Sequence, residues 1–162
     1  MNKSATAGCF ALTLLVAGVY FTPLQAGESG KWRGQAVLVT KYEHVAQVAD
    51  QENHLLVLGE DDGVVLNADG GSFLDKARYQ VVVVGDTAEM FHGYKTFTTA
   101  DGSQVFARFE TTEMTPTGPK GTWEFIRGTG PYEGITGQGV YTITRVGEGV
   151  VLDLLEGEYK IP

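Results

Sequence analysis

Short runs of β-branched and aromatic residues, separated by glycine-rich turns, constrain the fold of this chain most strongly. Twenty of its 22 glycines follow residue 26, and no window keeps a 3.6-residue apolar period over three turns. The runs have the length of strands and are bounded by turn-forming residues. They predict strands at residues 34–42, 53–58, 64–66, 78–84, 89–98, 104–110, 123–127, 139–144 and 150–155, with residues 159–161 closing the sheet.

The connections between these runs are too short for crossover helices. Residues 59–63, 67–72, 100–103 and 146–149 are predicted as turns, and residues 115–121 as a longer loop. Consecutive antiparallel strands in this number close into a barrel or stack as a sandwich. The strands carry few of the prolines or lysines that protect exposed edges. We therefore expect an all-β fold of eight to ten short strands that form a single closed antiparallel barrel.

Residues 1–26 have the pattern of a cleavable export signal. Lys3 precedes an uncharged, largely apolar stretch of 14 residues, from Gly8 to Phe21, and Pro23 then ends it. This stretch is shorter than the roughly 18 residues that a membrane span needs. We expect cleavage after Ala26 and a barrel domain over residues 27–162. The mature protein is expected to be periplasmic or extracellular and not to associate with the membrane.

The mature part would be acidic and free of cysteine. Cys9 is the only cysteine, so residues 27–162 have no disulfide, thiolate zinc ligand or thiol nucleophile. They contain eleven Lys and Arg against twenty Asp and Glu side chains, a net charge of −9. No basic cluster is present, so nucleic acid is not an expected partner.

A glycine-rich stretch, Gly128-Thr-Gly-Pro-Tyr-Glu-Gly-Ile-Thr-Gly-Gln-Gly139, is the most informative motif. It lacks the Lys-Ser or Lys-Thr of a phosphate loop and leads into a strand instead of a helix, so nucleotide binding is not indicated. Sharp turning and close backbone packing are the functions that such glycines serve. The structural glycines expected here are Gly128, Gly130, Gly134 and Gly137.

Together with Trp123-x-Phe125, this stretch resembles the glycine signature of the allene oxide cyclase and dirigent barrel superfamily, which includes exported bacterial proteins. The resemblance is specific over residues 120–145 and weaker over residues 54–110. It implies an eight-stranded barrel with a central cavity, often trimeric, that acts on small apolar molecules without a cofactor. The superfamily's cyclase residues do not map onto this sequence, so the resemblance carries the fold and not an activity.

Strand alternation supplies the candidate ligand-binding residues. Phe106, Arg108 and Glu110 must share one face of their strand, and Tyr141 shares a face with Ile143. If this face of the strand points outward, Phe106 is exposed between two charged residues. If it points inward, Arg108 and Glu110 pair and form a polar site in an apolar lumen. Both directions remain open, and the inward one predicts Phe106, Arg108, Glu110 and Tyr141 as ligand contacts.

Metal and hydrolase chemistry are not indicated. His44, His54 and His92 form no HxH or HExxH pattern. Ser72 and Ser103 lie in glycine-rich turns, outside any nucleophile-elbow context. We therefore expect no metal and no cofactor.

Three functions remain. The first is an exported barrel that binds a small apolar or aromatic molecule in its lumen. The second is a cofactor-free cyclase or isomerase on the same barrel. The third is an envelope interaction protein with a filled lumen, and the volume of the lumen separates it from the other two.

Overall fold

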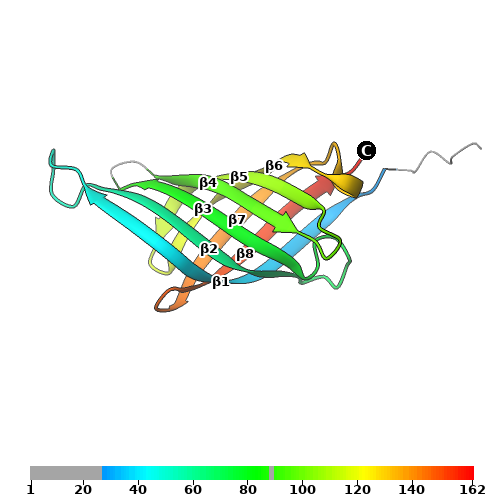
Figure 1. Cartoon of the computed structure of the whole chain (residues 1–162), viewed down its shortest axis with the longest axis horizontal. Helices are drawn as coiled ribbons and strands as arrows, with labels where there is room; N and C mark the ends of the chain where they lie inside the picture. Colours follow the sequence, from blue (N-terminus) through cyan, green and yellow to red (C-terminus); the bar gives the residue numbers. More distant parts are fainter. Residues whose placement is uncertain (1–26, 88–89) are drawn as a thin grey trace, which may run out of the picture.

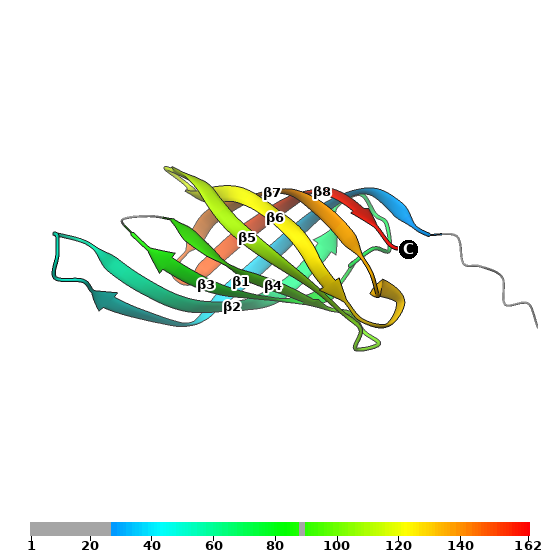
Figure 2. The ribbon, with the colours of Figure 1, turned by 90° about the horizontal axis from the view of Figure 1, so that it is seen from above.

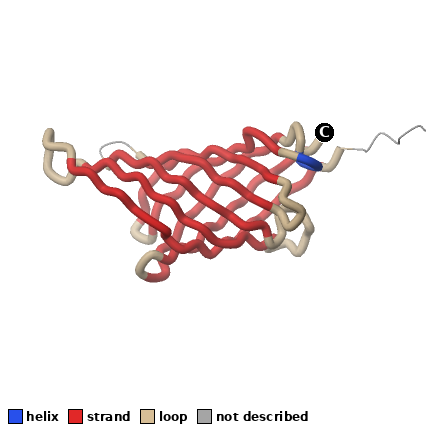
Figure 3. Tube along the Cα trace, in the orientation of Figure 1, coloured by secondary structure: helices blue, strands red, loops and turns tan. Residues whose placement is uncertain are grey.

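A computed structural model of the chain describes residues 27–87 and 90–162. The predicted signal peptide lies outside the described residues. The described part is almost entirely strand (Figure 3), with one short 3-10 helix at Gly130–Tyr132. No helix among the described residues is both long and apolar enough to cross a membrane.

Eight antiparallel strands form one closed barrel in which each strand pairs with its neighbours in sequence and β8 pairs back with β1. The predicted fold class is confirmed. The strands are β1 (Ser29–Gln47), β2 (Leu55–Asn67), β3 (Ala77–Asp86), β4 (Phe91–Thr98), β5 (Gln104–Thr115), β6 (Gly118–Gly128), β7 (Thr136–Gly147) and β8 (Val150–Lys160).

The predicted turn at residues 59–63 is wrong, because β2 runs through it without interruption. Gly59 pairs with Glu43 of β1 and with Val83 of β3. Gly63 lies where a Cβ atom would come within 2.0 Å of the Val37 carbonyl oxygen. The glycines therefore allow close strand pairing at this point and do not turn the chain.

Other strand boundaries also differ from those predicted; β1, for example, runs over Ser29–Gln47 and not only over residues 34–42. The expected loop at residues 115–121 shrinks to a tight connection between Thr115 and Gly118, because β5 and β6 continue to pair up to these residues. The expected closing strand at residues 159–161 is the end of β8, which pairs with β1 through Lys160 and Ser29. These differences lengthen strands that the sequence already predicted.

The barrel is elongated, and its strands are unequal in length. The long β1–β2 hairpin extends well beyond one end, whereas the 3-10 helix and the C-terminus lie at the other (Figures 1 and 2). A register shift between Thr40 and Tyr42 interrupts the β1–β2 pairing where the hairpin leaves the barrel. Such a bulge bends its strand locally, and this bend allows the β1–β2 hairpin to extend away from the barrel.

Aromatic side chains fill the end of the lumen nearest the C-terminus. Trp32 contacts Phe73, Phe97 and Trp123 edge to face, with ring centroids 5.6–5.8 Å apart. Phe73, in the connection between β2 and β3, stacks on Tyr159 of β8. Edge-to-face and stacked rings are favourable packing geometries. This half of the lumen is a packed core that holds the strands together and leaves the opposite half for a site.

Candidate functional site

A buried ion pair crosses the lumen and separates its filled end from its open end. Lys95 on β4 reaches Asp153 on β8, with 2.6 Å between Nζ and Oδ2. Both side chains are almost completely buried, at 1% and 0% exposure. In the barrel order, β4 and β8 lie on opposite sides. The ion pair therefore connects opposite walls of the barrel through its interior.

Tyr79 on β3 completes a three-residue network. Its hydroxyl donates to Asp153 Oδ2 at 2.6 Å and accepts from Lys95 Nζ at 2.7 Å. Removing two charges from water is costly, and only close, well-bonded partners offset that cost. Burial lowers the pKa of Lys95, and Asp153 opposes that shift. Burial, followed by the charge of Asp153, raises the pKa of Tyr79 well above its usual value.

Two further aromatic rings flank the Lys95 ammonium. Its Nζ lies 4.5 Å from the ring centre of Tyr141 and 5.0 Å from that of Phe109. The faces of aromatic rings attract cations. Tyr141 is fixed by a 2.7 Å hydrogen bond between its hydroxyl and that of Thr111. Burial raises the pKa of Tyr141 to about 12, so its hydroxyl stays protonated at neutral pH.

A cavity of about 540 Å³ occupies the other half of the lumen, with Lys95 among its lining residues. Its walls are mainly apolar and include Leu38, Val81, Val83, Phe109 and Ile143. Three exposed charged residues, Glu43, Arg145 and Glu148, lie at its rim. The volume and the predominantly apolar lining are typical of small-molecule sites.

Besides Glu43 and Glu148 at the rim, a third carboxylate, that of Asp61 on β2, lines this cavity. Its Oδ1 accepts a 2.7 Å hydrogen bond from Thr40 Oγ1. The charge of Asp61 opposes the lowering of the Lys95 pKa by burial and adds to the burial-driven rise of the Tyr79 pKa. The cavity therefore combines apolar walls with an acidic and a basic group.

The loop at the tip of the β1–β2 hairpin is tied to the end of β3 by His54. Its Nδ1 lies 2.6 Å from Asp50 Oδ1, and its Nε2 lies 2.8 Å from Asp86 Oδ1. With a carboxylate at each ring nitrogen, the doubly protonated imidazolium makes both hydrogen bonds. Hydrogen bonding to Asp50, and then to Asp86, raises the pKa of His54.

Of the two directions left open for Phe106, Arg108 and Glu110, the structure shows the outward one, so these residues are not contacts of a ligand in the lumen. Arg108 and Glu110 are exposed on the outer wall, where Arg108 pairs with Glu124 of β6. Phe106 is half-buried beneath Arg127, whose guanidinium carbon lies 5.6 Å from the ring centre. Because the Arg127 side chain on the neighbouring strand packs over its ring, Phe106 can face outward without being fully exposed to solvent. The inward residues of β5 are the apolar ones, Val105, Ala107 and Phe109.

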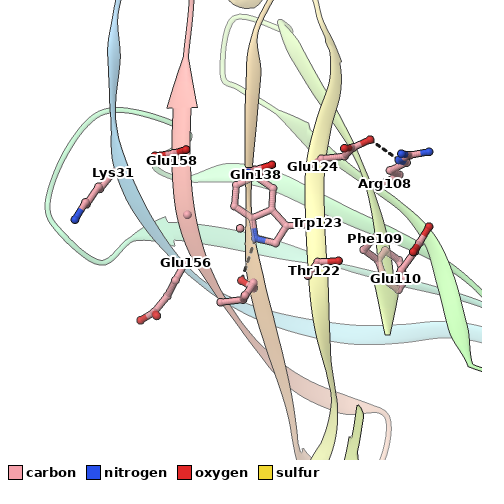
Figure 4. Close-up of a pocket in the computed structure, with 13 residues that line it drawn as sticks. Lys31, Arg108, Phe109, Glu110, Thr122, Trp123, Glu124, Gln138, Glu156 and Glu158 are labelled. Atoms are coloured by element: carbon pink, nitrogen blue, oxygen red, sulfur yellow. Dashed lines mark hydrogen bonds and ion pairs between the residues drawn. The ribbon is translucent and has the colours of Figure 1, made fainter. Parts of the chain in front are cut away.

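Arg108 and Glu110 instead line a shallow groove on the outer wall (Figure 4). Lys31, Gln138, Glu156 and Glu158 also line it, and Trp123 donates its indole N–H to the Val140 carbonyl beside it. Among the predicted ligand contacts, only Tyr141 points into the lumen, where it adjoins Lys95.

The four predicted structural glycines lie at or beside the β6–β7 connection. Gly130 and Gly134 adopt positive φ angles of 58° and 76°. Gly128 and Gly137 have extended backbones, but a Cβ atom would lie 2.0 Å from the Tyr132 carbonyl oxygen in the first case and 2.4 Å from that of Glu158 in the second.

Sequence reasoning missed Lys95, Asp153, Tyr79 and Asp61. A signal for Lys95 was present, because residues 91, 93, 95 and 97 share one strand face and two of them are phenylalanines. Asp153 similarly alternates with Val151 and Leu155. Within residues 27–87 and 90–162, no three His, Cys, Asp or Glu side chains converge in the way that a metal site requires.

No protein-family model matches this chain, and no curated protein matches it in sequence. Solved structures do match. The pterocarpan synthase dirigent protein GePTS1 aligns with a TM-score of 0.54 at 10% identity, over 88% of this chain and 89% of its own. The pterocarpan synthase dirigent protein PsPTS1 aligns with a TM-score of 0.52 at 12% identity, over 87% of this chain and 98% of its own. The chain has a dirigent-like barrel. At this level of identity the similarity concerns the fold, and the activity in those names belongs to those proteins.

Proposed function

We propose that this chain is an exported barrel protein that binds a small, mainly apolar molecule in the open half of its lumen. The observation that carries the proposal is the cavity of about 540 Å³, walled by apolar side chains and containing the Lys95 ammonium. Burial of apolar ligand surface would drive binding, and the few polar groups would orient the ligand. A filled barrel that serves only as an interaction protein is disfavoured by this volume.

Two adjacent valines allow a matched test of lumen binding. Val83 lines the cavity, whereas Val84 is exposed on the outer wall of the same strand. We expect Val83→Trp to abolish binding of the uncharged fluorescent dye N-phenyl-1-naphthylamine, and Val84→Trp to leave it unchanged. Equal binding by both variants, or no binding by the parent protein, would contradict the proposal. Native mass spectrometry of protein from its own source would identify the class of any co-purifying ligand.

A cofactor-free cyclase or isomerase on the same barrel is the second candidate. It is favoured by Lys95 and Tyr141, which line the cavity, and by Tyr79, which is hydrogen-bonded to Lys95, because clustered ionisable groups with shifted pKa values are frequent at reactive sites. Cyclisation and isomerisation leave the mass of a molecule unchanged. Incubating a recovered ligand with fresh protein and following its chromatographic retention separates the two candidates. A new species of equal mass supports catalysis, whereas an unaltered ligand supports binding alone.

Export is part of the proposal and rests on the pattern of residues 1–26. The expected mature protein begins at Gly27 and is recovered from the periplasm or the medium. Intact-mass measurement of protein made in its own host tests this. Retention of residues 1–26 in a membrane fraction would contradict export by cleavage.

We further propose that copies of the chain associate through an outer apolar band, in line with the often trimeric superfamily that the sequence resembles. The band consists of Val37 and Val39 on β1, Val64 and Leu66 on β2, and Leu154 on β8, all of them exposed. Strand register places Val37 between Val64 of β2 and Leu152 of β8, so apolar side chains continue across the three strands, with Gln35 lying between Leu66 and Leu154. A closed barrel has no free strand edge, so its wall is the surface available for association.

A further inference from the structure

Asp61 and Lys95 occupy one row of inward-facing positions on neighbouring strands. Asp61 of β2 pairs with Val81 of β3, which in turn pairs with Lys95 of β4. Two strand spacings separate the backbones of Asp61 and Lys95 by about 10 Å. All three side chains line the cavity, with the apolar Val81 between the two charged residues.

The Lys95 ammonium retains hydrogen-bonding capacity. It has three N–H donors, and its hydrogen bonds to Asp153 and Tyr79 use two of them. The surrounding rings of Phe109 and Tyr141 attract the cation but accept no conventional hydrogen bond. A ligand oxygen that enters the cavity can therefore accept the third N–H.

The Asp61 carboxylate is a complementary acceptor. Its two oxygens offer about four lone-pair positions, of which the bond from Thr40 occupies one. Asp61 forms no ion pair with any side chain in the described parts of the chain. A ligand O–H or N–H that reaches this wall can therefore donate to it.

The charges around the cavity disfavour an anionic ligand. Asp61 and Asp153 lie at or beside its inner end, and Glu43 and Glu148 lie at its rim, against Lys95 and Arg145 as the cations. The Lys95 charge is already paired with Asp153. A ligand carboxylate would thus meet uncompensated negative charge in a partly desolvated site, which is costly.

We infer that Asp61 and Lys95 form a recognition pair for an uncharged polar group that both donates and accepts a hydrogen bond, with a hydroxyl as the simplest case. The inference rests on the proposed lumen binding and specifies the polar end of the ligand. The ligand hydroxyl donates to Asp61 and accepts from Lys95, while its apolar body lies along Val81 and the walls beyond. The site selects hydroxyl-bearing apolar molecules over the corresponding hydrocarbons and carboxylates.

Three probes that share one ring system test this selection in the unaltered protein. They are 2-naphthol, naphthalene and 2-naphthoate, each titrated by displacement of N-phenyl-1-naphthylamine. We expect 2-naphthol to bind about tenfold more tightly than naphthalene, because charge-assisted hydrogen bonds strengthen binding on this scale. We expect 2-naphthoate to bind more weakly than 2-naphthol.

Asp61→Asn and Asp62→Asn provide a matched pair of variants. Asp62 is the next residue along β2, and its side chain pairs with Arg78 on the outer wall. Asp61→Asn should reduce the preference for 2-naphthol over naphthalene and strengthen 2-naphthoate binding, whereas Asp62→Asn should change neither.

The outcomes separate this inference from the proposed function. Equal affinities for 2-naphthol and naphthalene, with both displacing the dye, would overturn the recognition pair and leave lumen binding intact. An unchanged preference in a folded Asp61→Asn variant would overturn the role of Asp61 specifically. Failure of the dye to bind at all would overturn both proposals.

Discussion

Lys95 Nζ and Asp153 Oδ2 lie 2.6 Å apart across the lumen, joining β4 to β8 through the interior of the barrel. These strands share no backbone hydrogen bonds, since three strands separate them in either direction around the barrel. The ion pair thus adds a cross-link that strand pairing does not provide. It also sets the depth to which a ligand can enter, because the aromatic core fills the lumen beyond it.

Replacing Lys95 with methionine should destabilise the protein by roughly 3–5 kcal/mol, because the Asp153 charge would remain buried without its partner. The double variant Lys95→Met/Asp153→Leu should lose less stability than Lys95→Met alone. Urea denaturation followed by tryptophan fluorescence measures both. If the double variant lost as much stability as Lys95→Met or more, the coupling across the lumen would be refuted.

Replacing Tyr79 with phenylalanine should cost about 1–3 kcal/mol, because it removes a hydroxyl bonded to both members of the ion pair and leaves their polar atoms less satisfied. Tyr94→Phe is the matched control, because Tyr94 is exposed on the outer wall of β4. Thermal unfolding of the two variants tests this. Similar melting temperatures for both would mean that the Tyr79 hydroxyl is energetically unimportant.

Gly130→Ala and Gly134→Ala should each cost about 1 kcal/mol or more, because both glycines have positive φ angles. An added Cβ would also lie 2.6 Å from Ser103 Oγ at position 130 and 2.8 Å from Pro162 Cγ at position 134. Gly147→Ala is the control, since the nearest atom to its Cβ would be 3.9 Å away. Equal denaturation midpoints for all three variants would contradict a special geometry in the β6–β7 connection.

The barrel was predictable from sequence because its evidence is local. Alternating apolar positions and turn-forming residues define most of the strands, and the number of strands favours closure. The turn predicted at residues 59–63 failed because glycine and aspartate form turns in most contexts. In this strand, position 63 must be glycine because the Val37 backbone leaves no room for a Cβ atom, and the Asp61 side chain faces the lumen.

The site was less predictable because its key contacts join residues far apart in sequence. Alternation alone places Lys95 on the same face as Phe91 and Phe97, which is a recognisable anomaly. Its partner, however, is 58 residues away and comes within reach only when the barrel closes. Arg108 and Glu110 were misplaced for a similar reason, since the cover for Phe106 comes from Arg127 on the next strand.

The His54 contacts predict a pH-dependent stability. Because hydrogen bonds to Asp50 and Asp86 raise the pKa of His54, its stabilising effect is fully present below the unfolded-state pKa of about 6.5 and is lost as the pH rises through the folded-state value. The parent protein should therefore exceed His54→Gln in melting temperature by more at pH 6 than at pH 9. The exposed His92 provides the control variant His92→Gln. A constant difference between the parent and His54→Gln across this range would refute the effect.

The outer apolar band predicts an oligomer that a single charge should weaken. Val37 lies at the centre of the band, 56% exposed, with Val64 beside it on β2 and Leu152 beside it on β8. Burying a glutamate there would require desolvation of its charge in each copy, so Val37→Glu should shift the proposed oligomer towards monomer. Tyr94→Glu, on the outer wall of β4, introduces the same charge away from the band and should leave the assembly unchanged. Sedimentation velocity over a range of concentrations measures both variants. A monomeric parent protein, or an unaltered Val37→Glu oligomer, would exclude the band as the interface.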